Sequence, residues 1–191
     1  MLQPSGRERR RGAMTRLVAV LGAALLVACS LDPSPTMPEL ASGTVSEGGI
    51  TLSATAEPAV VPAGQPIEVE AVLTHDSPEP LIVSGSGSGI VFFSVTRLED
   101  GLSSGPPVMT DDCARHELPP GEPMIVPFAK SGGFSADDPD AGFLRVYLAD
   151  PELTLPQGTW RIDVSTSGTL GDECTGEPLA LELALTVTVT E

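Results

Sequence analysis

Side chains that carry out catalysis are scarce in this chain of 191 residues. It has one lysine, one tyrosine, two histidines and no asparagine, so few combinations of general base and nucleophile are available. Gly101-Leu-Ser103-Ser-Gly105 has the spacing of a nucleophile elbow, but Pro106 and Pro107 follow directly. The second proline would break the helix that this motif requires. We therefore predict that the protein is not an enzyme and uses no cofactor.

Positive charge is also scarce. The chain has 10 Lys and Arg against 26 Asp and Glu, a net charge of −16. Because five arginines precede residue 17, the portion from Cys29 onward has 5 basic against 25 acidic residues, hence −20. Such a surface repels phosphate backbones, which excludes nucleic acid as a partner. This portion also lacks an apolar run long enough to span a bilayer.

The first 28 residues have the pattern of a secretory signal peptide. Arginines open the segment, and twelve uncharged residues follow from Leu17 to Ala28. That run has the length of a signal-peptide core and falls short of the roughly 20 residues of a membrane-spanning helix. Met14 is an alternative start, because Met14-Thr-Arg16 alone supplies a charged region. We expect residues 1–28 to be removed on export.

The apolar run ends in Leu26-Val27-Ala28-Cys29. These residues resemble the lipobox of bacterial lipoproteins, whose cysteine is diacylated and then exposed as the new N-terminus. The resemblance implies two or three acyl chains, such as palmitate, on Cys29, and two chains suffice for stable attachment to a membrane. We expect a lipid-anchored protein of the cell membrane or the outer membrane that faces the periplasm or the extracellular space.

Composition changes after the lipobox. Residues 29–49 are rich in proline, serine and glycine and show neither a helical nor an alternating apolar period, which predicts a flexible tether. From residue 50 the period becomes two, with apolar and polar residues alternating in 50–56, 67–73 and most regularly in 179–189.

Further short strands are expected at 90–98, 124–128 and 159–165, whereas 143–148 suits either a strand or a short helix. Short strands divided by glycine and proline turns predict an all-β domain over residues 50–191. Its expected architecture is an antiparallel sandwich of about seven or eight strands.

One of the turns carries a family resemblance. Leu155-Pro-Gln-Gly158 leads into Thr159-Trp160-Arg-Ile-Asp-Val164. This segment resembles the L-x-x-G-x-[YW]-x-[VI] corner of bacterial Ig-like domains, which BsuPI-type proteinase inhibitors share. The resemblance implies an Ig-like sandwich over residues 50–191. It supports a binding or structural module and, as the alternative, a proteinase inhibitor or regulator.

A histidine and cysteine pattern raises copper as a further alternative. Cupredoxins are β-sandwiches that use an early histidine and a later Cys-x-x-His…Met cluster. His75, Cys113, His116 and Met124 occur here in that order. The gap between His116 and Met124 is longer than in that family, and several expected strands still follow Cys113.

Calcium is the other metal alternative. Asp137, Asp138 and Asp140 form an acidic cluster, and carboxylate oxygens in a loop are suitable ligands for Ca²⁺. The spacing of an EF-hand is absent. In so acidic a chain, such clusters are usually solvated surface.

The remaining cysteines are expected to form a disulfide. The lipobox resemblance assigns Cys29 to lipidation, which leaves Cys113 and Cys174. Export places this pair in an oxidising compartment, which favours a bond between them. The two cysteines fall at the same end of the sandwich if residues 143–148 do not form a crossing strand. Taken together, the sequence predicts a membrane-anchored lipoprotein whose module binds a protein partner in the cell envelope.

Overall fold

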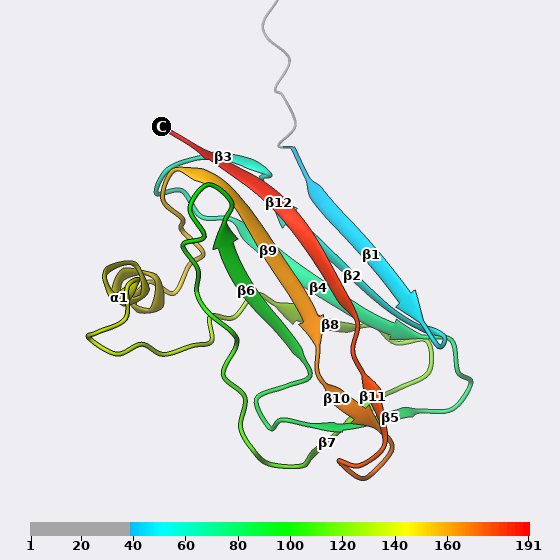
Figure 1. The fold of residues 1–191 in the computed structure, drawn as a ribbon. Coiled ribbons are helices and arrows are strands. Elements are labelled where there is room, and N and C mark those ends of the chain that lie inside the picture. Colours follow the sequence, from blue (N-terminus) through cyan, green and yellow to red (C-terminus); the bar gives the residue numbers. More distant parts are fainter. Residues whose placement is uncertain (1–38) are drawn as a thin grey trace, which may run out of the picture. The chain divides into compact units, whose positions relative to one another are not determined.

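The computed structural model of the protein describes residues 39–191, so the predicted signal peptide and Cys29 lie outside the described residues. Figure 1 shows strands throughout this part of the chain and a short helix at one side. The elements in chain order are β1 (Ala41–Glu47), β2 (Ile50–Glu57), β3 (Val60–Pro62), β4 (Glu68–His75), β5 (Leu81–Gly85), β6 (Val91–Arg97), β7 (Ala114–Leu118), β8 (Met124–Pro127), α1 (Ala141–Ala149), β9 (Gly158–Thr166), β10 (Gly168–Leu170), β11 (Glu177–Leu179) and β12 (Glu182–Thr190).

The strands form three four-stranded sheets. One has the order β1-β2-β4-β8, the second β3-β12-β9-β6 and the third β11-β10-β5-β7. Neighbouring strands are antiparallel except β3 and β12, which are parallel. The predicted all-β antiparallel sandwich is confirmed. The described residues contain more strands than expected. β3, β10 and β11 have three residues each, too few to show a period in the sequence, and β5 and β7, of five residues each, were also not predicted.

Alternating side chains from the strands fill one core. Leu52, Ala54 and Ala56 of β2 are at most 1 % exposed, and their polar neighbours face outward. The same pattern holds for β4 and β12, so three segments with the predicted alternation supply much of the buried cluster. Burial of apolar surface stabilises a fold by about 25 cal/mol per Å², and this is the main force that holds the sheets together.

The predicted tether, residues 29–49, is wrong over residues 41–47, which form strand β1. The sequence pattern places residues 41–47 in the tether, but they pair with β2 along their whole length, from Ala41 opposite Ala56 to Glu47 opposite Ile50. On the inward side, a Cβ added to Gly43 would lie 3.4 Å from the Leu183 side chain, so the strand packs closely on the core. The strand escapes detection because its inward residues are small and only weakly apolar.

The segment 143–148 is helical. It lies in α1, which buries Ala141, Leu144 and Tyr147 at helical spacing. In the described part of the chain, no helix is both long and apolar enough to cross a membrane.

Lys130, the one lysine of the chain, fixes the C-terminal end of α1. Its Nζ donates hydrogen bonds to the carbonyl oxygens of Tyr147 (2.6 Å), Asp150 (2.8 Å) and Glu152 (2.6 Å). It also lies 4.5 Å from the centre of the Tyr147 ring. Carbonyls at the end of a helix lack partners within the helix and carry partial negative charge. The ammonium group satisfies them and thereby fixes the chain that leaves the helix.

Trp160 closes the turn that leads into β9. It is fully buried, and its Nε1 donates a hydrogen bond to the carbonyl oxygen of Pro156 at 2.8 Å. The Phe143 ring stacks on it with centroids 5.6 Å apart, and the Arg97 guanidinium lies 5.7 Å from its ring. The indole N–H therefore holds the chain at Pro156 against the start of β9.

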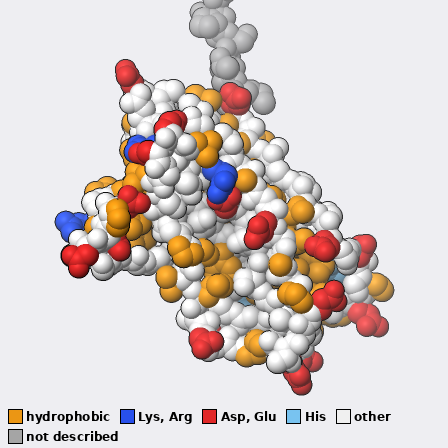
Figure 2. Space-filling model, in the orientation of Figure 1, with side chains coloured by type: hydrophobic (Ala, Val, Ile, Leu, Met, Phe, Trp, Pro, Cys, Tyr) orange, Lys and Arg blue, Asp and Glu red, His pale blue; other side chains and the backbone are white. Residues whose placement is uncertain are grey.

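The negative charge is largely uncompensated by ion pairs. Among the residues that the structure describes, Arg97, Arg115 and Arg161 form ion pairs with nearby carboxylates, all at least partly exposed. Exposed pairs of this kind contribute about 0–1 kcal/mol each. Figure 2 shows acidic side chains spread over the visible face with few basic ones among them.

We expect the melting temperature to rise with NaCl concentration. Between about 0.15 and 1 M salt the Debye length falls from about 8 to about 3 Å, which screens the repulsion among the carboxylates. Differential scanning fluorimetry at neutral pH measures the shift. The dependence should shrink as the pH is lowered toward the isoelectric point, which for the exported portion lies below the value of 4.3 for the whole chain. A flat or falling curve at neutral pH would contradict the prediction.

Candidate functional site

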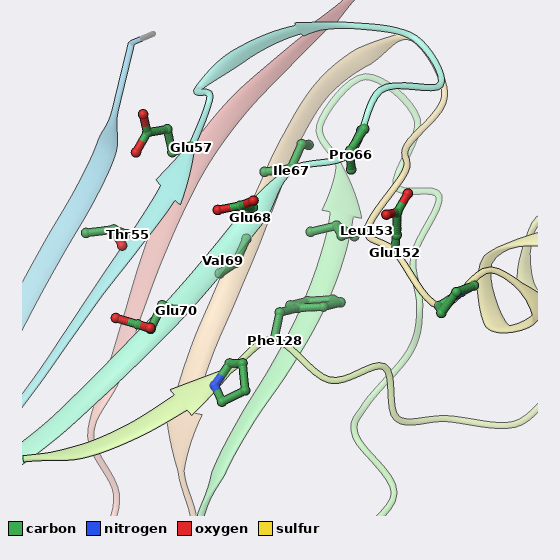
Figure 3. Close-up of a pocket in the computed structure, with 12 residues that line it drawn as sticks. Thr55, Glu57, Pro66, Ile67, Glu68, Val69, Glu70, Phe128, Glu152 and Leu153 are labelled. Atoms are coloured by element: carbon green, nitrogen blue, oxygen red, sulfur yellow. The ribbon is translucent and has the colours of Figure 1, made fainter.

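A groove of about 500 Å³ lies at the end of sheet β1-β2-β4-β8 where β2 finishes and β4 begins (Figure 3). Four parts of the chain line it. Its lining residues are Thr55 and Glu57 of β2, residues 66–70 at the start of β4, Pro127 and Phe128 at the end of β8, and residues 151–153 after α1.

Four glutamates surround the groove. Glu57, Glu68 and Glu70 project from β2 and β4, and Glu152 lies on the opposite side, with Phe128 and Leu153 between them in Figure 3. The glutamates of the strands face outward because they alternate with the buried residues of β2 and β4. All four side chains are exposed.

The strand register brings like charges together. Glu57 lies directly opposite Glu68, and Glu70 follows Glu68 on the same face of β4. Like charges in directly opposite positions of a sheet are destabilising. In the described part of the chain, none of the four groove glutamates forms an ion pair with a lysine or an arginine. The groove therefore has a concentrated negative charge with no partner.

The floor of the groove is apolar. Ile67 and Leu153 are 3 % exposed, and the half-buried Phe128 packs against Phe93 with ring centroids 5.2 Å apart. Three of the lining residues, Pro66, Pro127 and Pro151, have no backbone N–H. The lining side chains thus offer carboxylate acceptors and one donor, the Thr55 hydroxyl.

Backbone hydrogen bonds hold the two sides of the groove together. Ile67 N donates to Leu153 O at 3.0 Å, and Phe128 N donates to Val69 O at 2.9 Å. Lys130 Nζ reaches the carbonyl of Glu152, which ties this side of the groove to α1. A ligand would therefore meet a surface that is already formed.

Lys130 Nζ lies 4.5 Å from the centre of the Tyr147 ring. The dependence of stability on pH tests whether Tyr147 is buried there. Burial raises the pKa of Tyr147 to about 12 from the ordinary 10.0, because a buried phenolate loses hydration. Between these two pH values the unfolded chain has lost the proton and the folded chain has kept it. We therefore expect the free energy of unfolding to fall by about 2 kcal/mol from pH 10 to pH 12.

The single tyrosine makes this measurement direct. Absorbance at 295 nm should show ionisation with a midpoint near pH 12 in the folded protein, and Tyr147→Phe should remove the step. A midpoint near 10 in a folded sample would mean that the phenol is solvated.

The predicted disulfide is present in the structure. The sulfur atoms of Cys113 and Cys174 are 2.06 Å apart and their Cα atoms 5.9 Å apart. The bond joins the loop before β7 to the loop between β10 and β11, and Arg115 pairs with Asp172 beside it at 3.0 Å. Residues 143–148 form part of a helix and not a strand that crosses the sandwich. The two loops therefore fall at the same end of the sandwich, as predicted for that case.

The copper interpretation is wrong. Cys113 has its sulfur in the disulfide and cannot supply a thiolate. The Nε2 atom of His75 lies 2.9 Å from the carbonyl oxygen of Leu118, and that of His116 lies 2.9 Å from the carbonyl oxygen of Ser86. Met124 begins β8, which pairs with β4. Two imidazoles that bond to separate backbone carbonyls do not form a copper site.

Among the described residues, the three aspartates of the calcium interpretation do not converge on a common point. One carboxylate oxygen of Asp138 accepts a hydrogen bond from Ser135 N at 2.6 Å, and Asp140 is the residue before α1. Asp137 is exposed. Within residues 39–191, no three His, Cys, Asp or Glu side chains come together in a group that could hold a metal ion. The Asp138 carboxylate thus closes the turn that precedes the helix.

Sequence reasoning misses the groove. The outward positions Glu68 and Glu70 could be read from the alternation in Ile67-Glu-Val-Glu70, but nothing in the sequence links them to Phe128 or Glu152. The structure shows the proximity, since β8 and the segment after α1 both reach the start of β4. In comparisons with known proteins, the chain matches no family model and no curated protein.

Proposed function

We propose that the protein is a lipid-anchored binding module that holds a protein partner at the surface of a membrane of the cell envelope. The anchor is inferred from the Leu26-Val-Ala-Cys29 segment after a basic and then an apolar region. The observation that carries the binding function is the preformed groove, whose apolar floor is surrounded by unpaired carboxylates. Pockets of about 300–1,000 Å³ with an apolar lining and a few polar groups are typical of binding sites.

The anchor predicts a defined N-terminus. Mass spectrometry of the membrane fraction should show a mature chain that begins at acylated Cys29, because two or more acyl chains hold such a protein stably in the membrane. Cys29→Ser should move the protein to the soluble fraction. A wild-type product that is soluble, lacks acyl chains and retains Met1 or Met14 would contradict this prediction.

Site-specific photo-crosslinking tests the binding function. A photoreactive amino acid in place of Thr55 lies in the groove, and one in place of Thr186 lies on an exposed position of β12. We expect a discrete cross-linked partner in intact cells from position 55 and none from position 186. The same adducts from both positions, or none from either, would contradict a role for the groove.

The alternative function, inhibition of a proteinase, has weaker support. It rests on the resemblance of Leu155 to Val164 to BsuPI-type inhibitors, and in this chain the central residue of that segment, Trp160, is buried in the corner. A corner of this kind builds the fold and presents little to a protease. A panel of envelope proteases assayed with the mature protein separates the two functions.

A further inference from the structure

We infer that two copies of this chain pair through strand β1, antiparallel and in a register centred on Thr44. The pairing joins the two copies of sheet β1-β2-β4-β8 into one continuous sheet. This inference goes beyond the proposed function and does not depend on what the groove binds. It follows from an open strand edge, from the lack of protection along that edge and from the symmetry of the groups that the edge presents.

Strand β1 is the outermost strand of its sheet and pairs on one side only (Figure 1). Its seven residues pair with β2 without a bulge, from Ala41 opposite Ala56 to Glu47 opposite Ile50. Among the residues that the structure describes, no backbone hydrogen bond is formed on the other side of β1. A regular open edge of this kind is a template for a further strand.

The hairpin turn decides which backbone groups face the open side. Gly48 and Gly49, with φ angles of 58° and 79°, form a two-residue turn, which makes Glu47 and Ile50 a hydrogen-bonded pair. Because pairs alternate along an antiparallel ladder, every second residue from Glu47 back to Ala41 also bonds to β2. The N–H and C=O groups of the residues between them point away from β2, and these residues are Ser42, Thr44 and Ser46.

The other sheet edges are protected, whereas β1 is not. Strands β3, β8 and β11 each contain a proline, β7 has two charged residues and follows the disulfide, and residues 102–104 bond to the edge of β6. β1 has no proline, and its one charged residue, Glu47, is its last. Natural proteins use prolines, charges and covering segments to prevent association between edges. The edge of β1 is therefore available for pairing.

The open side of β1 is complementary to itself. Ser42 and Ser46 lie two residues to either side of Thr44. A second β1 that runs antiparallel through Thr44 therefore places each outward N–H opposite an outward C=O. On the outer face of the sheet, this register sets Ser42 against Ser46 of the second copy and Thr44 against Thr44 of the second copy. Cross-strand pairs of Ser and Thr hydroxyls stabilise a sheet.

The inner face fits the same register. Gly43 and Val45 are on the core side of β1, and a Cβ added to Gly43 would lie 3.4 Å from the Leu183 side chain. The register places Val45 of the second copy beside Gly43, the one inward position of β1 that has no side chain. Val45 and Leu183 are both half-buried in the single chain, so pairing removes more of their apolar surface from water.

Charge favours this edge as the place where two copies meet. The portion from Cys29 onward has a net charge of −20, so most surfaces of two copies repel each other. Residues 41–46 are uncharged, and contact along them brings few carboxylates together. Salt should therefore strengthen the pairing, because it screens the repulsion between the rest of the two domains.

Pairing gives the assembly two grooves. In the proposed register Ala41 is opposite Glu47 of the second copy, so the two strands begin about 20 Å apart along the sheet. The groove of each copy lies at the end where its own β1 begins, because Ala41 is opposite Ala56, the neighbour of Glu57. A partner with two matching segments can occupy both grooves and gain avidity.

Cross-linking of the full-length chain in intact cells tests the pairing. Thr44→Cys places one thiol of each copy at the twofold axis, with the two Cα atoms about 5.5 Å apart. A short bismaleimide should link the copies at least tenfold more than in the parent chain, which has no thiol at this position. Thr186→Cys lies at an exposed position of another sheet and should stay at the level of the parent chain.

A mixture of two variants tests the register. Ser42→Cys produced together with Ser46→Cys should give a cross-linked heterodimer, because the two positions are opposite each other. Either variant alone should cross-link at least fivefold less, since the same position on the two copies is separated by about 14 Å along the strands. Mass spectrometry of the linked peptides identifies the positions.

Two substitutions at Thr44 test whether the backbone carries the contact. Thr44→Pro removes an outward N–H that β2 does not use, and it should lower the dimer fraction at least tenfold in light scattering of the purified full chain in detergent. Thr44→Val keeps the N–H and should change that fraction less than about twofold. A thermal melt confirms that both variants are folded. The dimer fraction of the parent chain should rise from about 0.05 to 0.5 M NaCl.

Three results would overturn the inference. Equal cross-linking at positions 44 and 186 would mean that the copies collide without a preferred contact. A folded Thr44→Pro chain that stays dimeric would place the interface away from β1. Cross-links from position 44 only to a different protein would assign the edge to another occupant. None of these results changes the adduct expected at position 55, so the proposed binding function would stand.

Discussion

Replacement of both Cys113 and Cys174 by serine is expected to lower the free energy of unfolding by about 4 kcal/mol. The bond closes a loop with a sequence separation of 61 residues, and the chain-entropy relation for a loop of that size gives this magnitude. The stability of a typical domain is about 5–15 kcal/mol, so the loss is a large share of the total. The small sheet β11-β10-β5-β7 should lose order first, because the bond joins loops at two of its strands.

Urea denaturation followed by circular dichroism measures this loss. Reduction of the wild-type protein should reproduce the unfolding curve of the double variant and leave the curve of the variant itself unchanged. A non-reducing peptide map should show the two cysteines in one cross-linked species. If maleimide labels both thiols in the native exported protein, the bond is absent and the prediction fails.

Trp160→Ala is expected to destabilise the sandwich by about 3–5 kcal/mol, the range for removal of a large aromatic side chain from a packed core. The side chain is fully buried, packs on Phe143 and donates to the Pro156 carbonyl. Its loss leaves a cavity at the corner and also frees α1, because Phe143 belongs to that helix. We expect the helix to detach before the sheets unfold.

Trp160→Phe separates the contribution of ring packing from that of the hydrogen bond to the Pro156 carbonyl. Phenylalanine keeps most of the ring but has no N–H, so the Pro156 carbonyl loses its partner at a cost of about 1–3 kcal/mol. Because Trp160 is the one tryptophan of the chain, circular dichroism rather than fluorescence must follow unfolding of both variants. A loss of less than 1 kcal/mol in the alanine variant would mean that the corner is not part of the stabilising core.

The parts of the fold that sequence predicts are those with strong local signals. Strands β2 and β4 combine strict alternation with apolar residues on one side, and both lie where the pattern places them. The third alternating stretch, 179–189, is divided between the end of β11 and β12, which begins only at Glu182. The disulfide follows from the cysteines that remain once Cys29 is assigned to the proposed lipidation. The ambiguous segment 143–148 became helical because Ala141, Leu144 and Tyr147 can be buried together only at helical spacing.

Features that depend on contacts between distant segments were missed or wrong. No strand was predicted at β5, yet Ser84 of that strand is buried and Ser86 Oγ lies 2.9 Å from the hydroxyl of Thr110. The copper and calcium patterns matched known spacings, but the side chains meet backbone groups instead. Spacing along the chain does not decide which groups approach each other when the segments between them fold into separate strands.

The early start of β1 limits how far the domain can stand from the proposed anchor on Cys29. Only the eleven residues from Ser30 to Leu40 separate Cys29 from Ala41, and a fully extended chain of that length spans at most about 40 Å. Ala41 is opposite Ala56, the neighbour of Glu57 in the groove, so the groove lies at the end of the strand pair where β1 begins. If Cys29 carries the proposed acyl chains, a partner bound in the groove is held close to the membrane, and a partner presented much farther from that leaflet is out of reach.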